Sequence, residues 1–132
     1  MKLSEAQAVI DAAIAKANAL DVQISAAVVD RVGDIITLAR MDGSTKLITN
    51  IAQGKARASA LLGIPSGECA RHFDGLPLSS LLGLWSAGMD GIVCVPGGVP
   101  LLRDGELVGA VGASGASGTQ DEEIARAGAT WF

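Results

Sequence analysis

The segment between Gly97 and Thr119 constrains the fold more than any other part of the chain. Asp104-Gly105 is typical of a two-residue β-hairpin turn, because both residues tolerate the positive φ that such a turn requires. Apolar and branched residues flank the dipeptide and predict strands over Val99 to Arg103 and Glu106 to Ala113. Glycines within the second of these strands favour the close approach of another backbone.

Local patterns predict the remaining elements. Apolar residues recur at helical spacing after Ser4 and after Thr45, and two branched runs around a polar turn predict a second hairpin. Ser4 with Gln7, and Thr119 with Glu122, have the spacing of helix capping boxes. The further predicted elements are helices over Ser4 to Ala19, Thr45 to Leu62, Gly67 to Phe73 and Thr119 to Ala129, and strands over Ile24 to Val29, Ile35 to Ala39 and Gly91 to Val95. The pattern therefore indicates an α/β (α+β) fold, in which helices pack on an antiparallel sheet of five strands.

The composition limits the class of protein. The 132 residues suit a single domain over residues 1–132, and 49 % of them are apolar, which suffices for a core. Aromatic residues make up only 3 %, so we expect a core of Val, Ile, Leu and Ala, whose small side chains also suit close contact between subunits of a homo-oligomer. A net charge of −4 with scattered basic residues argues against nucleic-acid binding. No apolar run has membrane-spanning length and the N-terminus shows no signal-peptide core, so we expect a cytoplasmic protein with no membrane partner and with free thiols.

Four segments, in this order and spacing, resemble the GlcG/HbpS family, whose domain also occurs as the carboxy-terminal domain of some corrinoid adenosyltransferases of the PduO type. These segments are Ala26 to Asp30 with Gly33; Arg40 to Gly43; Gly54 to Ala58; and Gly97 to Pro100 followed by Val108 to Gly115 and Gln120 to Glu122. The resemblance covers nearly the whole chain.

The resemblance implies a profilin-like fold, with a five-stranded antiparallel sheet flanked by helices, and homo-oligomers up to octamers. It also implies a small-molecule ligand, because family members are linked to haem binding, to corrinoid metabolism and to catabolic operons. The resemblance does not decide between cofactors, and haem and a corrinoid are the candidates.

Cys69 and His72 are the first candidates for chemistry. Ser66 is predicted to cap the short helix, which would place Cys69 in its first turn, where the helix dipole lowers a thiol pKa. His72, the only histidine, follows three residues later on the same helical face. The pair could supply a nucleophile and its base, or ligate haem iron, and an incidental pair without function is the alternative. Glu68 is a further candidate for proton transfer.

Arg40, Asp42 and Lys55 are candidates for holding an acidic ligand. Arg40 and Asp42 stand two positions apart at the end of a predicted strand, so their side chains share a face. Arg40 could grip a carboxylate, and Asp42 could act as a base or cap the next helix, although an ion pair that fixes the turn is the alternative. Lys55 follows Ile51 by four residues in an apolar stripe, so its ammonium either lines a pocket or reaches water along the edge of the core.

The glycine-rich loops offer backbone contacts to a ligand. Gly97 and Gly98 follow a proline and leave open space beside a strand, although the same glycines would also serve to turn a strand corner. Gly115 and Ser117 precede the last helix, whose first N–H groups suit an anion. The alternative is that side chains of that helix cap these groups.

These residues support functions of different classes. The first is an enzyme of a catabolic pathway, a hydrolase, isomerase or dehalogenase that acts on a small carboxylic acid without a metal cofactor. Arg40 and Lys55 would hold the carboxylate, and Asp42, Glu68 or Cys69 would transfer a proton or act as nucleophile. The second is a haem- or corrinoid-binding sensor or carrier, and the third is a structural subunit without a ligand. The sequence shows no metal-binding signature, so we predict no metal ligand.

Overall fold

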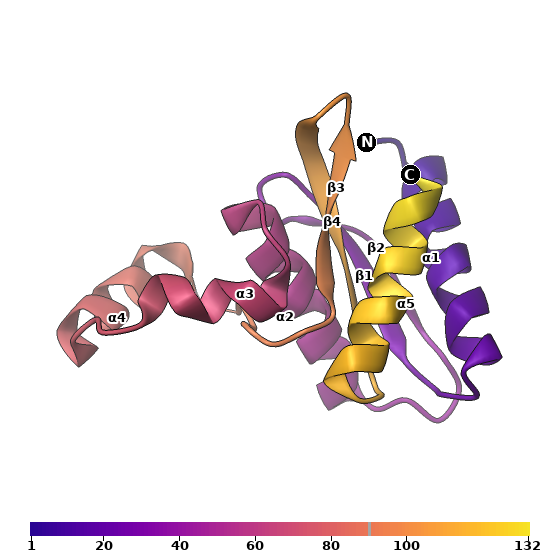
Figure 1. Ribbon diagram of the computed structural model, residues 1–132, viewed down its shortest axis with the longest axis horizontal. Helices are drawn as coiled ribbons and strands as arrows, with labels where there is room; N and C mark the ends of the chain where they lie inside the picture. The colour runs from indigo at the N-terminus through magenta and orange to yellow at the C-terminus, as the bar shows by residue number, and fades with distance from the viewer. Residues whose placement is uncertain (90) are drawn as a thin grey trace.

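A four-stranded antiparallel sheet forms the centre of the protein, and helices cover both of its faces (Figure 1). The computed structural model describes residues 1–89 and 91–132. The strands are β1 (Ser25–Asp30), β2 (Ile35–Arg40), β3 (Gly98–Arg103) and β4 (Glu106–Ser114), in the order β2-β1-β4-β3. The helices are α1 (Leu3–Ala19), α2 (Lys46–Leu62), α3 (Ser66–Cys69), α4 (Leu78–Leu84) and α5 (Gly118–Trp131), with the short helical turns η1 (Ala70–Phe73) and η2 (Trp85–Met89).

The core has two layers, one on each face of the sheet, because successive side chains of a strand point to opposite faces. Helices α1 and α5 pack side by side on one face, where Val28 and Val111 belong to the larger core cluster. Helix α2 covers the other face, where Val29 packs with Ala56. The predicted close approach at Gly112 is confirmed, since a Cβ there would overlap the backbone of α2.

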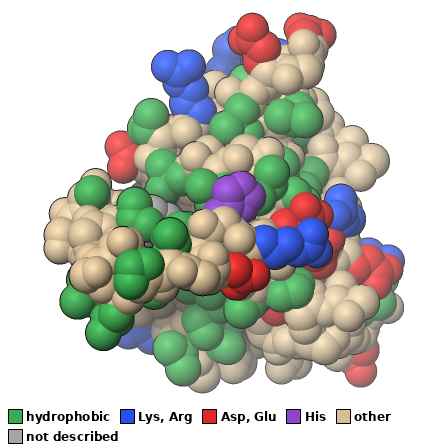
Figure 2. Space-filling model, turned by 60° about the vertical axis from the view of Figure 1, so that its left-hand side comes forward, with side chains coloured by type: hydrophobic (Ala, Val, Ile, Leu, Met, Phe, Trp, Pro, Cys, Tyr) green, Lys and Arg blue, Asp and Glu red, His purple; other side chains and the backbone are tan. Residues whose placement is uncertain are grey.

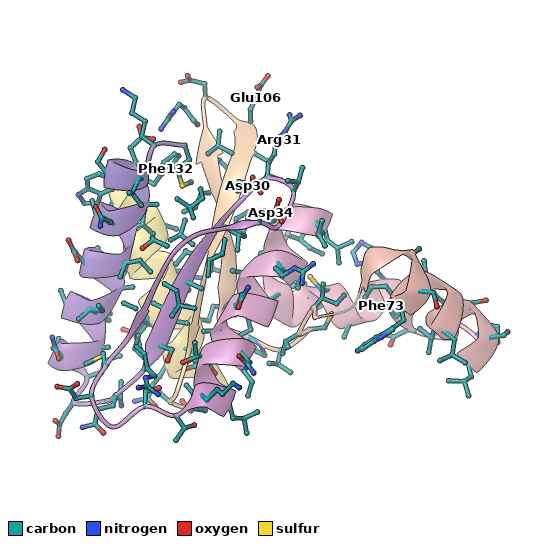
Figure 3. All side chains as sticks on the ribbon, turned by 180° about the vertical axis from the view of Figure 1, so that it is seen from behind. Asp30, Arg31, Asp34, Phe73, Glu106 and Phe132 are labelled. Atoms are coloured by element: carbon teal, nitrogen blue, oxygen red, sulfur yellow. The ribbon has the colours of Figure 1, made fainter. Side chains whose placement is uncertain are left out.

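Both predicted hairpins are present. Strands β3 and β4 meet at Asp104-Gly105, whose φ values of 53° and 81° are the two positive values that such a turn requires. Strands β1 and β2 join through a turn held by Asp30, whose Oδ1 accepts from the N–H groups of Val32 and Asp34 at 2.9 and 3.0 Å (Figure 3). Local turn chemistry therefore sets the register of each hairpin.

The predicted strand over Gly91 to Val95 is wrong, so the sheet has four strands rather than five. This segment lies against α2 instead. The Val93 N–H donates to the Gly54 carbonyl at 3.0 Å, and a Cβ on Gly54 would lie 2.5 Å from the Val93 side chain. The segment thus packs partly on a helix, and an apolar run alone does not distinguish this placement from a strand in a sheet.

Two predicted helix caps are also wrong. Helix α1 begins at Leu3 rather than after Ser4, and the Glu5 carboxylate accepts from the Lys2 N–H at 2.6 Å. Helix α5 has Ser117 as its N-cap rather than Thr119. The chain turns out of β4 at Gly115, whose φ is 137°, and this early turn lets the helix begin at Gly118, before Thr119.

Residues 75–89, which we call the arm, project from the body of the protein (Figure 1). The arm has no charged side chain. Leu78, Leu82 and Trp85 are 70, 58 and 59 % exposed, and α4 packs on η2 and on no other element to a comparable extent. No helix in the described ranges has the length and apolar character that a membrane span requires.

Candidate functional site

Lys55 and Asp121 form a buried ion pair between α2 and α5. Lys55 Nζ lies 2.7 Å from Asp121 Oδ2, and the two side chains are 3 and 4 % exposed. The ammonium also donates to the Ala113 carbonyl at 3.1 Å and to Ser114 Oγ at 3.3 Å. Asp121 Oδ1 accepts from the Ala116 N–H at 2.9 Å. Both charges are thus hydrogen-bonded on several sides, which is the condition under which a buried ion pair is tolerated.

Gly97 and Gly98 lie directly against this pair. Gly97 has a φ of 124°, and a Cβ on it would lie 2.8 Å from Asp121 Cβ and 2.9 Å from Lys55 Nζ. A Cβ on Gly98 would overlap the Lys55 carbonyl. Protein atoms therefore fill the space beside both glycines, which favours the strand-corner interpretation over a ligand contact. The Lys55 side chain is 3 % exposed, so the predicted reach of its ammonium to water is wrong, and Lys55 lines neither of the two hollows described below.

Gly115 and Ser117 shape the loop that enters α5. A Cβ on Gly115 would overlap the backbone of Gln23, which precedes β1. Gln120 Oε1 accepts from the Ser117 N–H at 3.3 Å, and the Gln120 N–H donates to Ser117 Oγ at 3.3 Å. Side chains of the helix therefore occupy N–H groups that were candidates for an anion, and the structure favours the self-capping interpretation.

Arg40 and Asp42 lie at the exposed end of β2, an edge strand of the sheet. In the part of the chain that the structure describes, no ion pair joins them to each other or to another group. Asp42 does not cap α2, whose N-cap residue is Thr45. Because Lys55 is buried under β4, the structure does not bring Arg40 and Lys55 together around one ligand.

The Cys69 thiol is buried, and its surroundings are unlike those of a reactive nucleophile. Its Sγ lies 3.6 Å from the Pro65 carbonyl and 3.7 Å from the Ala58 carbonyl, and the side chain has no exposed surface. Burial, with Cys94 beside it and Glu68 nearby, raises the pKa of the Cys69 thiol to about 12. The predicted lowering of this pKa is therefore wrong.

The physical reason lies in Ser66, which does not cap α3. Its hydroxyl donates to the Val95 carbonyl at 2.6 Å and accepts from the Gly98 N–H at 2.7 Å, so it ties α3 to the segment before β3. Helix α3 is a single turn and carries Cys69 into the interior. His72 is exposed, as Figure 2 shows for the one histidine of the chain, and Glu68 is exposed as well. The structure thus separates Cys69 from His72 rather than pairing them.

A cavity of about 350 Å³ opens where the arm leaves the body. Figure 3 shows Phe73 at the root of the arm. The lining residues come from η1, the arm and the segment before β3, and they are Phe73, Leu81, Leu84, Trp85, Ile92 and Cys94. None of the six is charged, and Cys94 alone among them carries a side chain that commonly binds metals.

The sequence pattern places Cys94 inside a core strand and gives no sign of this cavity. Cys94 instead lies half-buried in a segment without regular structure. Burial raises the pKa of the Cys94 thiol, and a hydrogen bond with Cys69 lowers it in part. The one available signal is that Phe73 and Trp85, two of the chain's four aromatic residues, bracket an uncharged, leucine-rich stretch.

A second hollow, of about 480 Å³, lies beside the start of α5 and is polar. It is lined by Pro96, Thr119, Glu122, Glu123 and Arg126. Arg126 pairs with Glu122 at 2.6 Å, and Glu123 pairs with Lys16 at 2.6 Å. These charges are therefore already matched within the described residues, which makes the apolar cavity the stronger ligand site.

Comparisons with known proteins agree with this architecture. The family model described as "Haem degrading protein HbpS-like" matches residues 1–130. Protein GlcG of Escherichia coli strain K12 is 32 % identical over 109 residues, which cover 83 % of this chain and 77 % of GlcG.

Solved structures share the fold along the whole chain. Klebsiella pneumoniae ORFY matches with a TM-score of 0.87 and 28 % identity, covering 100 % of this chain and 90 % of ORFY. A structure described as the PduOC:haem complex matches with a TM-score of 0.85 and 27 % identity, covering 100 % of this chain and 94 % of PduOC. Because the family model spans residues 1–130, this chain belongs to the HbpS-like family, the GlcG/HbpS family that its sequence segments resemble.

Proposed function

We propose that this protein binds a flat tetrapyrrole, with haem as the first candidate, in the cavity between the arm and the body. The lining of this cavity carries the proposal, since its walls are apolar, two of its residues are aromatic, and it contains one sulfur donor. Sites for small ligands are concave and mostly apolar, with few polar groups and volumes of about 300 to 1,000 Å³. The cavity of about 350 Å³ lies within this range and opens to solvent at the root of the arm.

The residues present fit a haem group. Haem iron takes cysteine or histidine as an axial ligand, and Cys94 is the residue in the cavity that can serve. Phe73 and Trp85 offer aromatic faces to the macrocycle. Bound haem would supply an iron centre for redox chemistry or for binding a further small molecule. The Cys94 thiol must release its proton in order to bind iron, and burial, which raises the pKa of this thiol, makes the release less favourable.

Relatives support this class of ligand. PduOC, which is similar to this chain over its whole length, has been solved as a complex with haem. The family model takes its description from haem degradation. A corrinoid is the alternative macrocycle, and the titration below separates the two by using each in turn.

The predicted enzyme for a small carboxylic acid has less support. It requires Arg40 and Lys55 to hold the carboxylate beside a group that transfers protons. Lys55 is instead paired with Asp121 inside the protein, and neither Arg40 nor Lys55 lines the apolar cavity. Ligand binding therefore ranks ahead of hydrolase, isomerase or dehalogenase activity.

Titration of haem into the reduced protein, followed by absorption in the Soret region, tests the proposal. We expect a shifted Soret band at one equivalent per chain, and an affinity at least about tenfold lower for Cys94→Ala, because an iron ligand is lost. His72→Ala is the control, since His72 is exposed and does not line the cavity. A cobalamin titration under the same conditions tests the corrinoid alternative.

Two results would count against the site. An unshifted Soret band contradicts haem binding itself. If Cys94→Ala binds haem as tightly as the natural chain while His72→Ala loses affinity, the iron ligand is the exposed His72 and not Cys94 in the cavity.

We also infer a homo-oligomer, up to the octamer that the sequence resemblance implies. Exposed apolar side chains on the arm, such as Leu78 and Leu82, support this inference, because large exposed apolar patches mark interaction surfaces. Light scattering coupled to size exclusion measures the mass. A monomeric mass at micromolar concentration would contradict the inference.

A further inference from the structure

The two cysteines of the chain lie on segments that are bonded to each other, although residues 70–93 separate them in sequence. The Cys69 Sγ lies 3.7 Å from the carbonyl of Ala58 in α2, and each thiol shifts the pKa of the other. The backbone holds them there: the hydroxyl of Ser66, three residues before Cys69, donates at 2.6 Å to the carbonyl of Val95, the residue after Cys94. On the other side of Cys94, the Val93 N–H is bonded to α2. These bonds hold the Cys69 and Cys94 segments side by side against α2.

The two thiols differ in access. Cys69 has no exposed surface, whereas Cys94 is half-buried and lines the cavity. A small oxidant that enters the cavity meets Cys94 first. Cys69 is fully buried and would act as the resolving thiol.

We propose that Cys94 is a site of oxidation by low-molecular-weight disulfides such as oxidised glutathione, and that Cys69 resolves the product into a Cys69–Cys94 disulfide. One consequence rests on the proposed function: an oxidised Cys94 no longer offers a thiolate to haem iron, so oxidation lowers the affinity for haem.

The reaction balances in two exchange steps. The Cys94 sulfur attacks one sulfur of oxidised glutathione, the S–S bond breaks, and one glutathione leaves with the proton that Cys94 gives up. The Cys69 sulfur then attacks Cys94 in the mixed disulfide, displacing the second glutathione, which takes the proton of Cys69. Two protein thiols are oxidised, and one glutathione disulfide is reduced to two thiols.

Burial of Cys69 sets the pace of the second step. Because its pKa is raised to about 12 by burial and by Cys94 beside it, only a small fraction is thiolate near neutral pH.

The Cys69–Cys94 disulfide would also constrain the wall of the cavity. It closes a loop over residues 70–93, which contains η1, α4 and η2. Of the six lining residues, all except Cys94 lie within this loop. Oxidation of the two cysteines would thus change both the Cys94 sulfur, which is proposed to bind iron, and the conformational freedom of the arm.

Peptide mapping without reduction tests the disulfide independently of haem. Trypsin cleaves after Arg57, Arg71 and Arg103, so Cys69 and Cys94 fall in separate peptides, 58–71 and 72–103. After incubation of the reduced protein with oxidised glutathione at pH 8, we expect these peptides to be joined and the intact mass to fall by two hydrogens. Cys69→Ser should stop at one glutathione on Cys94, and Cys94→Ser should stay unmodified because its remaining thiol is buried.

The proposal is overturned if the natural chain ends as a stable glutathione adduct without joined peptides, or if the disulfide links two chains. It is also overturned if Cys94→Ser reacts as fast as Cys69→Ser, because Cys94 would then not be the entry point. Haem titration of the joined protein tests the consequence, with affinity expected to fall at least about tenfold relative to the reduced protein. If the reduced protein binds no haem, the proposed function fails, while the peptide map still decides the disulfide.

Discussion

The short segment from Cys94 to Gly98 borders the cavity at one end and the Lys55 ion pair at the other. The two regions differ in polarity and in how completely they are packed. At the ion pair, charges are fully partnered and glycines let the backbone cover them. At the cavity, uncharged side chains surround open space and a half-buried thiol. Residue types associated with catalysis, such as Lys55 and Asp121, can therefore serve only to hold the fold together. A ligand fits where the fold leaves an open surface without protein atoms packed against it.

The largest expected effect is the loss of one partner of the ion pair. Lys55→Met should lower the free energy of unfolding by about 3–5 kcal/mol, because it leaves the Asp121 carboxylate buried without its cation. Urea denaturation followed by circular dichroism measures the change. The double variant Lys55→Met with Asp121→Leu is the control and should recover most of the loss. A single-variant loss below about 1 kcal/mol would mean that the pair behaves like an exposed one and that the contrast with the cavity is false.

A glycine on the ion pair should matter more than a glycine in the arm. Gly97→Ala should cost about 1–3 kcal/mol, since its φ of 124° suits only glycine and a Cβ would meet Lys55 and Asp121. Gly83→Ala in α4 is the control. A Cβ there meets nothing within 4 Å, so the better helix former should stabilise α4 by up to about 1 kcal/mol. Thermal unfolding of both variants checks the sign of each change, and equal effects would contradict the comparison.

The start of α5 provides a smaller and more local test. Ser117→Ala should cost about 1 kcal/mol, because the Gln120 N–H loses its acceptor. Thr119→Ala should change stability by less than about 0.5 kcal/mol, since Thr119 lies inside the first turn and is exposed. Chemical denaturation of the two variants compares the observed cap with the one that the sequence pattern predicts. A larger loss for Thr119→Ala would reverse the assignment.

Local signals account for the parts of the fold that the sequence predicts correctly. The Asp104-Gly105 turn and the helical spacing in α1 and α2 depend only on neighbouring residues, and each is confirmed. The strand expected over Gly91 to Val95 fails because the segment bonds to α2 through the Val93 N–H, and a short apolar run looks the same in both settings. The fold class is therefore predictable here, whereas the number of strands is not.

The site is harder to predict because its contacts are long-range. Lys55 meets Asp121 across 66 positions, and no local pattern pairs them. Closeness in sequence pairs Cys69 with His72, but Cys69 is buried against Ala58 of α2 while His72 is exposed. The cavity itself depends on how the arm leaves the body, and a leucine-rich stretch carries no residue spacing that specifies that direction.

The smallest expected effect on stability is also the sharpest test of the cavity. Trp85 and Trp131 are 59 and 53 % exposed, so replacing either by alanine should change the free energy of unfolding by about 0.5 kcal/mol or less. Only Trp85 lines the cavity. Trp85→Ala should therefore weaken haem binding several-fold, since an aromatic face is lost, while Trp131→Ala should bind haem as the natural chain does. Parallel haem titrations and denaturation curves measure both properties, and equal haem affinities would place the ligand away from the arm. A stability loss in Trp85→Ala as large as that of Ser117→Ala would instead show that the arm is part of the packed core, which would remove the contrast between the two regions.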